Sequence, residues 1–330
     1  MVDLKKINLG ENHDVAVKAG GNLHAQCWDE SEIGVMSYND ELIRTDVGEN
    51  GVRVLCSSDC DLFLPRHAVL KVERVGGDAY LRDIVTRLTI QKVGGNLTIQ
   101  NIPVVEIDRI GGDCRLQGIH GSLTVYRISG DLRGDDISGS IKTEIVRGDV
   151  SVSSASGEVS LQASGDLKIS LLNQQEGTIS LRAKGDINVY VPSGLGASYQ
   201  IETPSRDIRI DMDGNLETCS VRDYSFKKGN GKISVSIYAS GDVQISDGEM
   251  PDQRLRDLFA RVSRHWDRVE REGELRFNER IWGRDGFRTQ LAEERNMERA
   301  RKAAERIEKR AQKRVKIALS RQVGDLSDLE

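Results

Sequence analysis

The chain has 330 residues, of which 33 are Gly and only 5% are aromatic. This composition argues against a large globular core and favours many tight turns around a thin aliphatic core. The net charge of −5 hides a division, because residues 251–330 contain 21 of the 47 Lys and Arg but only 16 of the 52 Asp and Glu, which leaves an acidic body and a basic tail.

Membrane and secretory segments are not expected. No stretch approaches the roughly 18 consecutive apolar residues of a membrane span, and the first residues lack the apolar run of a secretory signal. The five cysteines are odd in number and irregularly spaced, which argues against a disulfide framework. We therefore expect a cytoplasmic location.

Residues 1–65 show short β-like stretches without a regular spacing, and they include Trp28 and Tyr38. Terminal units of repeat proteins differ from the internal ones, because their outer surface faces water. We predict that residues 1–65 form an irregular β capping region at the N-terminus.

Residues 66–248 contain a nine-residue repeat. A typical unit opens with Gly and places apolar residues two, four and seven positions later. Gly112 is followed in this way by Cys114, Leu116 and Ile119, and Gly121 by Leu123, Val125 and Ile128. The spacing loosens after Leu171, where residues 173–176 indicate an inserted loop, and it resumes at Gly177.

The repeat predicts a mainly β fold, a parallel β-solenoid with two nine-residue units, about 18 residues, in each coil. Apolar residues two and four share one face of a strand because side chains alternate. The third breaks the alternation, so we expect a corner before it. Gly supplies the unusual φ at corners, and the Asp, Asn or Ser that follows is expected to bond its own backbone. A β-sandwich or barrel is the alternative fold.

Units of Gly, then Asp or Ser, then an aliphatic residue recur at Gly130, Gly139, Gly148, Gly165, Gly185 and Gly241. With these units the chain resembles the toastrack-type putative adhesin family, bacterial β-solenoid domains of unknown function, over about residues 10–248. The resemblance carries no catalytic motif and implies a role in assembly or in the membrane-stress (phage-shock) response. The chain is more loosely similar to bactofilins, which polymerise through solenoid ends.

Residues 249–330 change to a helical period and predict a charged tail of two amphipathic helices broken near residues 283–286. Three roles are open: covering the edge of the last coil, a helix–helix or coiled-coil oligomer interface, and binding to a membrane surface. The predicted interface residues are Leu255, Leu258, Phe259, Val262, Trp266, Val269, Phe277, Ile281 and Trp282.

The sequence offers few candidates for catalytic, metal-binding or nucleic-acid-binding residues. Cys56 and Cys60 with His67 lack a fourth zinc ligand, so buried or surface thiols are favoured over a metal site. Asp135 and Asp136 are favoured as solvated turn acids over a glycosidase pair. Acidic residues interleave with the basic ones of the last helix, which disfavours nucleic acid as a partner. We predict no catalytic residue, metal or cofactor.

The function predicted from these features is that of a non-enzymatic structural or scaffold protein. It would self-associate, as an oligomer or polymer, or dock a protein partner, through its helical tail or its solenoid ends. One alternative is a membrane-stress adaptor that binds a membrane surface or a partner. A second alternative is a solenoid enzyme that acts on polysaccharide.

Overall fold

The structure is a computed structural model, and it describes residues 4–9, 13–37, 43–48, 51–172, 176–205 and 207–248. The chain divides into two units, Met1–Arg256 and Asp257–Glu330, and all described residues belong to the first. The predicted helical tail, residues 249–330, lies outside the described residues.

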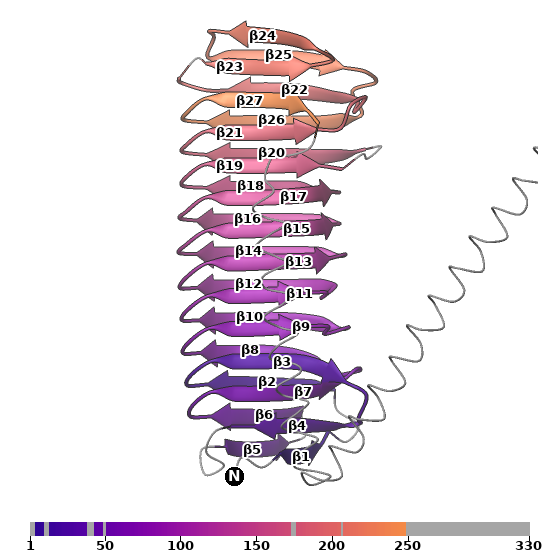
Figure 1. The fold of residues 1–330 in the computed structure, drawn as a ribbon, viewed down its shortest axis with the longest axis vertical. Coiled ribbons are helices and arrows are strands. Elements are labelled where there is room, and N and C mark those ends of the chain that lie inside the picture. Colours follow the sequence, from indigo (N-terminus) through magenta and orange to yellow (C-terminus); the bar gives the residue numbers. More distant parts are fainter. Residues whose placement is uncertain are drawn as a thin grey trace, which may run out of the picture. The chain divides into compact units, whose positions relative to one another are not determined.

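The described residues form two large sheets whose neighbouring strands are mostly parallel (Figure 1). Sheet A is 14-stranded and contains, in spatial order, β1 (Lys5–Asn8), β4 (Glu32–Met36), β7 (Cys60–Pro65), β3 (Leu23–Trp28), β9 (Ala79–Arg82), β11 (Leu97–Gln100), β13 (Cys114–Ile119), β15 (Leu132–Ser138), β17 (Val150–Ser156), β19 (Leu167–Leu171), β21 (Ile187–Val191), β27 (Val243–Asp247), β23 (Ile208–Met212) and β24 (Asn215–Cys219).

Sheet B is 13-stranded and faces sheet A. Its strands are, in spatial order, β25 (Asp223–Lys228), β22 (Ala197–Glu202), β26 (Ile233–Ala239), β20 (Gly177–Ala183), β18 (Val159–Ala163), β16 (Ser140–Val146), β14 (Ser122–Ile128), β12 (Val104–Ile110), β10 (Arg87–Val93), β8 (Val69–Val75), β2 (Asp14–Ala19), β6 (Gly51–Cys56) and β5 (Ile43–Gly48).

From β8 to β21 the chain alternates between the sheets, and we call each sheet B strand with the sheet A strand that follows it a coil. Leu123 pairs with Ile141 and Leu132 with Val150, each 18 residues further along. The coil that contains residues 173–176 is longer, because Val159 pairs with Ile179, 20 residues on. These registers agree with the predicted length of a coil, and the parallel pairing is that of a solenoid-like stack rather than an antiparallel sandwich.

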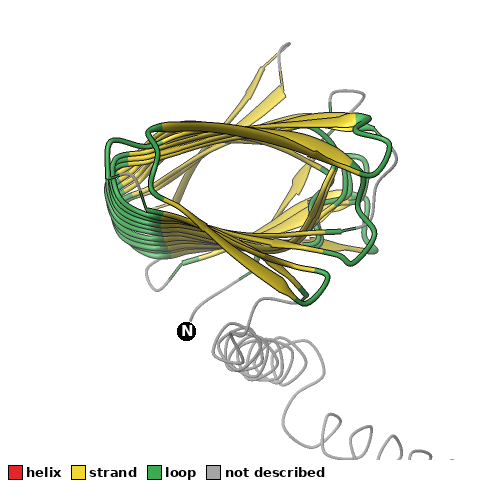
Figure 2. Cartoon of the chain, turned by 90° about the horizontal axis from the view of Figure 1, so that it is seen from above, coloured by secondary structure: helices red, strands yellow, loops and turns green. Residues whose placement is uncertain are grey.

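The core lies between the two sheets, which face each other when the stack is seen from above (Figure 2). It is filled by the first two apolar residues of each unit, such as Leu123 and Val125, at 1% and 0% exposure. Burying such a side chain contributes roughly 1.5–3 kcal/mol. The inward position of Thr143 is polar, and its Oγ1 accepts a hydrogen bond from the Gln162 backbone N–H at 2.9 Å. The repeat therefore builds a continuous aliphatic core.

The third apolar residue reaches the core by a different route from the one predicted. In most coils it remains inside the strand and the corner follows it, as at Ile137, which is 1% exposed within β15, whereas Ile84 and Ile102 lie just beyond β9 and β11. In sheet A the residue just before it has a left-handed φ, which turns two consecutive side chains outward. These residues stack in successive coils: Asp83, Asn101, Gly118, Asp136 and Ser154, with φ between 53° and 66°.

At the N-terminal end of the described part, chain order and spatial order differ. The coil β2/β3 pairs with β8/β9 on one side and with β6/β7 on the other. The coil β6/β7 is therefore outermost although it follows in the sequence. Antiparallel strands lie beyond it, β4 and then β1 on sheet A and β5 on sheet B.

At the C-terminal end of the described part, spatial order and chain order also differ. The coil β22/β23 is outermost, while β26/β27, which comes later in the chain, is inserted between it and β20/β21. Antiparallel β24 and β25 cover the outermost coil. Among the described residues the last coil of the chain, β26/β27, is therefore paired on both sides, and the free edges at this end belong to β24 and β25.

The predicted capping region, residues 1–65, contains both regular and irregular strands. Four of its strands, β2, β3, β6 and β7, join the parallel sheets. Its irregular part consists of the antiparallel strands β1, β4 and β5. The boundary at residues 65 and 66 stays a prediction.

Candidate functional site

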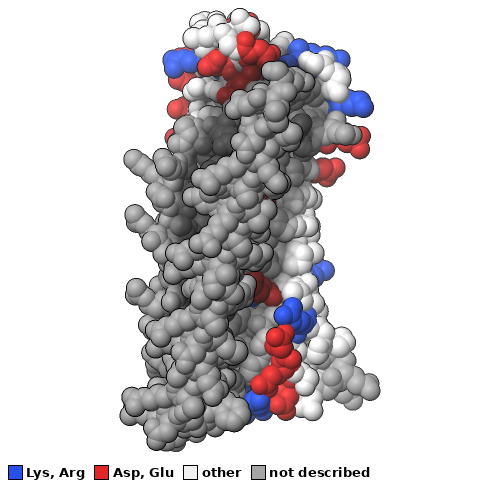
Figure 3. All heavy atoms as spheres, turned by 45° about the vertical axis from the view of Figure 1, so that its right-hand side comes forward, with Lys and Arg blue, Asp and Glu red and all other residues white. Residues whose placement is uncertain are grey.

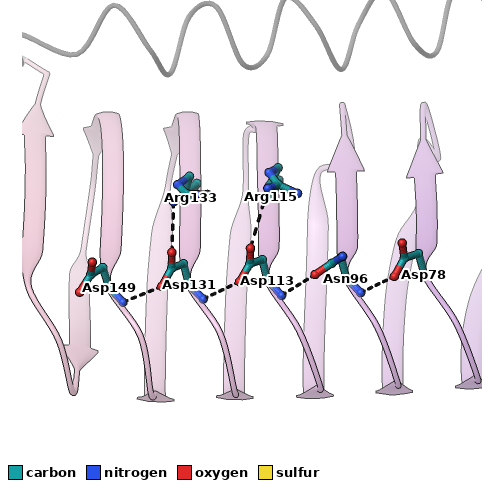
Figure 4. Close-up of polar contacts among 7 residues, drawn as sticks. All are labelled: Asp78, Asn96, Asp113, Arg115, Asp131, Arg133 and Asp149. Carbon is teal, nitrogen blue, oxygen red and sulfur yellow. Dashed lines mark hydrogen bonds and ion pairs between the residues drawn. The ribbon is translucent and has the colours of Figure 1, made fainter.

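The Asx residue after each corner glycine forms a ladder that runs along the stack (Figure 4). Asp113 Oδ1 accepts a hydrogen bond from the backbone N–H of Asp131 at 3.0 Å, and Asp131 Oδ1 accepts one from Asp149 at 3.0 Å. The ladder is, in spatial order, Asp59, Asn22, Asp78, Asn96, Asp113, Asp131, Asp149, Asp166, Asp186 and Asp242.

The ladder differs from the sequence-based expectation. We expected each Asp or Asn to bond its own backbone at the corner, but each side chain bonds the backbone of the neighbouring coil instead. The corners stack closely, with the Gly130 N–H donating to the Gly112 carbonyl at 3.0 Å. The repeated carboxylates therefore join coils together.

Nine of the ten ladder residues follow a glycine, and this close approach requires it; the exception is Asp59, which follows Ser58. A Cβ placed on Gly130 would lie 2.2 Å from Asp113 Oδ1, and one on Gly148 would lie 2.2 Å from Asp131 Oδ1. Such distances are well below van der Waals contact. Gly and Asx are thus one structural unit, each fitted to the residue of the adjacent coil.

Two arginines on the outer face of sheet A lie beside the ladder. Arg133 Nη2 is 3.1 Å from Asp131 Oδ2, and Arg115 Nη2 is 3.8 Å from Asp113 Oδ2 (Figure 4). The carboxylates keep Oδ1 for the ladder and offer Oδ2 to arginine. Partly exposed pairs of this kind contribute about 0–1 kcal/mol, so their main effect is to offset repulsion between stacked Asp residues.

The residues considered for zinc are only partly brought together. Cys56 Sγ and Cys60 Sγ are 2.6 Å apart. The His67 ring packs edge-on against His13, with centroids 4.9 Å apart. Within the described residues no group of three or more His, Cys, Asp or Glu side chains is arranged to hold a metal ion.

Asp135 and Asp136 have separate structural roles. The Asp135 carboxylate accepts a hydrogen bond from Ser153 Oγ at 2.5 Å. Asp136 has a φ of 53° and is one of the residues with left-handed φ that stack in successive coils of sheet A. Its Oδ2 lies 3.5 Å from His120 Nε2. Both acids therefore have roles in the architecture of the coil.

The nine predicted interface residues, from Leu255 to Trp282, lie outside the described residues. The sequence analysis named the solenoid ends as a possible association surface but did not identify which residues form them. Leu216 in β24 is 71% exposed and Val47 in β5 is 61% exposed. Both are on outermost strands, which pair with no further strand among the described residues and so offer an edge to which another strand can add.

Charges on the described surface are mixed. On the face that Figure 3 shows, acidic and basic side chains lie next to one another near both ends of the stack. At the C-terminal end Lys228 Nζ is 3.2 Å from both Asp213 Oδ2 and Asp247 Oδ1. At the N-terminal end Glu73 pairs with both Arg53 and Lys18. No helix among the described residues is long and apolar enough to cross a membrane.

One comparison with known proteins identifies a family. A family model described as Toastrack DUF4097 matches residues 8–246. A putative cell adhesion protein from Clostridium sporogenes ATCC 15579 is 13% identical, with 75% of this chain and 99% of that chain covered and a TM-score of 0.23. A putative adhesin from Bacteroides fragilis NCTC 9343 is 11% identical, with 75% and 97% covered and a TM-score of 0.26. No curated protein matches the chain.

Proposed function

The chain belongs to the Toastrack DUF4097 family, and from this premise we propose that it is a non-enzymatic scaffold that self-associates or docks a partner. The ladder carries the proposal. The acidic residue that the repeat supplies in coil after coil accepts a backbone hydrogen bond from the next coil, as Asp113 does from Asp131. The repeated carboxylates serve to build the stack.

Two surfaces support association. The first is the exposed end of the stack, where Leu216 lies on an outermost strand. The second is the tail, where Val262 and Trp266 belong to the predicted apolar stripe. A scaffold with these surfaces would work in the cytoplasm as a homo-oligomer, a polymer or a docking platform.

Mass photometry of the full chain at micromolar concentration tests the proposal. We expect particles larger than one chain. The double variant Val262→Asp with Trp266→Asp, which introduces two charges into the tail, should be monomeric if the tail mediates self-association. Leu216→Asp should do so if the end of the stack associates. Leu172→Asp is the matched control, because Leu172 is 42% exposed but directly follows β19, a strand inside the stack. A monomeric parent that captures no partner would contradict the proposal.

A second candidate function is a membrane-stress adaptor. The excess of Lys and Arg over Asp and Glu in residues 251–330 favours it, because a basic segment is attracted to anionic lipid. Flotation with vesicles containing an anionic phospholipid should carry the full chain upward at low salt, whereas neutral vesicles should not. Equal flotation with both, or with neither, would contradict this candidate.

A further inference from the structure

Two buried cysteines face each other in the outermost N-terminal coil. Cys56 is the last residue of β6 in sheet B, and Cys60 is the first residue of β7 in sheet A. Their side chains are 4% and 1% exposed, and their sulfur atoms are 2.6 Å apart. A disulfide requires about 2.0 Å between the sulfurs, so only a small movement separates the two thiols from a bond.

The fold itself imposes this juxtaposition. The same two positions bracket the corner in every internal coil, as Val93 and Leu97 or Ile128 and Leu132 do. In these two coils both residues are aliphatic and pack in the core. Cysteine at both positions in one coil replaces an apolar contact with a pair of thiols. The corner geometry, rather than a flexible loop, holds them together.

We propose that Cys56 and Cys60 form a reversible disulfide that joins sheet A to sheet B at the N-terminal end of the stack. A small-molecule disulfide is the oxidant. The Cys56 thiolate attacks it and releases one thiol, and the resulting mixed disulfide is attacked by the Cys60 sulfur, which releases the second thiol. Two protein thiols are oxidised as one disulfide is reduced to two thiols, so atoms and electrons balance.

The electrostatics of the pair select Cys56 as the first nucleophile. The hydrogen bond that the two sulfurs share lowers the pKa of Cys56 and raises the pKa of Cys60. A lower pKa gives a larger fraction of the reactive thiolate. Cys56 also pairs with Ile43 of the end strand β5. Local opening of that end would admit the oxidant.

The disulfide would act on the end of the stack. Strand β6 pairs with β5, and β7 pairs with β4, so the cysteine-bearing coil supports the antiparallel strands at this end. A covalent link across the corner would resist separation of the two sheets there. We therefore expect oxidation to protect β4 and β5 from opening.

Peptide mapping of the full chain tests the proposal directly. The reduced protein is incubated with oxidised glutathione under native conditions, alkylated in denaturant and cleaved with trypsin. Cleavage after Arg53 and Arg66 places both cysteines in one peptide, residues 54–66. We expect that peptide to lose two hydrogens and escape alkylation, and to be alkylated twice after added reductant. Amide exchange in β4 and β5 should slow on oxidation.

Cys114 is an internal control. It occupies the position equivalent to Cys60, and Ile110 occupies that of Cys56. We expect Cys114 to be alkylated fully in the parent, and the pair that Ile110→Cys creates to oxidise more slowly than Cys56 and Cys60, because that coil lies inside the stack. Cys56→Val, which restores the aliphatic residue of the other coils, should leave Cys60 alkylated. Full alkylation of Cys56 and Cys60 after native oxidation, or their linkage to other cysteines, would overturn the proposal.

Discussion

Glycine and Asx residues at the corners depend on each other across coils. Gly130 leaves room for Asp113 Oδ1, which in turn binds the Asp131 N–H. Replacing either residue disturbs a contact between two coils rather than a contact within one. The consequences can be measured one residue at a time.

We predict that Gly130→Ala destabilises the stack by about 1–3 kcal/mol, the usual range for overpacking a buried site. The new methyl would lie 2.2 Å from Asp113 Oδ1 and 2.8 Å from the Gly112 carbonyl oxygen. Thermal unfolding measures the effect. Gly48→Ala is the matched control, because nothing lies within 4 Å of its added Cβ. Equal midpoints for the two variants would contradict the ladder's role.

Two substitutions of Asp113 distinguish the contribution of its hydrogen bond to stability from that of its charge. Asp113→Asn keeps an oxygen acceptor, as Asn22 and Asn96 do naturally in the ladder. We predict a change of less than about 1 kcal/mol for this variant. Asp113→Ala leaves the Asp131 N–H without its acceptor and should cost about 1–3 kcal/mol.

Chemical denaturation at matched pH compares the two Asp113 variants. Combined with Asp113→Ala, Gly130→Ala should cost less than it does alone, because one of its two clashes is gone. Equal losses for Asp113→Asn and Asp113→Ala would show that charge, rather than the hydrogen bond, matters at this position.

At the scale of elements, the C-terminal end is held by an aromatic contact between strands. Tyr199 of β22 stacks on Phe226 of β25, with centroids 4.5 Å apart and ring planes at 6°. Tyr199 is 2% exposed, and its hydroxyl has no hydrogen-bond partner among the described residues. Burial raises the pKa of Tyr199 to about 12.

This pKa shift predicts a pH dependence. Because the folded pKa lies above the ordinary value of 10.0, the stability linked to Tyr199 is complete below pH 10 and is lost as the pH rises toward about 12. The loss amounts to roughly 2–3 kcal/mol. Tyr199→Phe should remove it, and should be neutral or slightly stabilising at pH 7 because no hydrogen bond is lost.

Amide exchange of β22 and β25 between pH 9 and pH 12 measures this effect. Tyr126→Phe serves as the control, because Tyr126 is 38% exposed. A parent and a Tyr199→Phe variant that lose protection in parallel would show that the phenol does not govern this end.

The elements differ in how far the sequence predicts them. Strands such as β14 and β15 follow from apolar residues at fixed positions, and so does the length of a coil. The ends do not follow, because a nine-residue pattern specifies which side chains point inward but not which coil lies beside which. Thus β26/β27 could be assigned to the repeat but not placed in the stack, and β2/β3 was expected only as part of an irregular cap.

The site was predictable only in part. The Gly-Asp units drew attention to the corners, yet an Asx side chain can bond its own turn or a neighbour, and only the stacking distance decides. The closeness of Cys56 and Cys60 is similar, since it depends on the shape of the corner between them. The order of the coils at the ends and the hydrogen-bond partners in the ladder depend on how the coils stack, which the sequence pattern does not specify.

At the scale of the whole molecule, the coil is the unit from which the stack is built. Ser122 pairs with Ser140 and Leu132 with Val150. Deleting residues 122–139 would therefore place β16 where β14 was and β17 where β15 was. Deleting only residues 131–139 removes a sheet A strand and joins two sheet B strands, which breaks the alternation.

These two deletions show whether a whole coil is the smallest unit that can be removed from the stack. Thermal unfolding followed by circular dichroism, with small-angle X-ray scattering of the full chain, would compare them with the parent. We predict that the 122–139 deletion stays folded with a β spectrum and shortens the stack by about 4.8 Å, whereas the 131–139 deletion melts far lower or fails to fold. Equal tolerance of both deletions, or unfolding of the first, would contradict the coil as the unit that builds this protein.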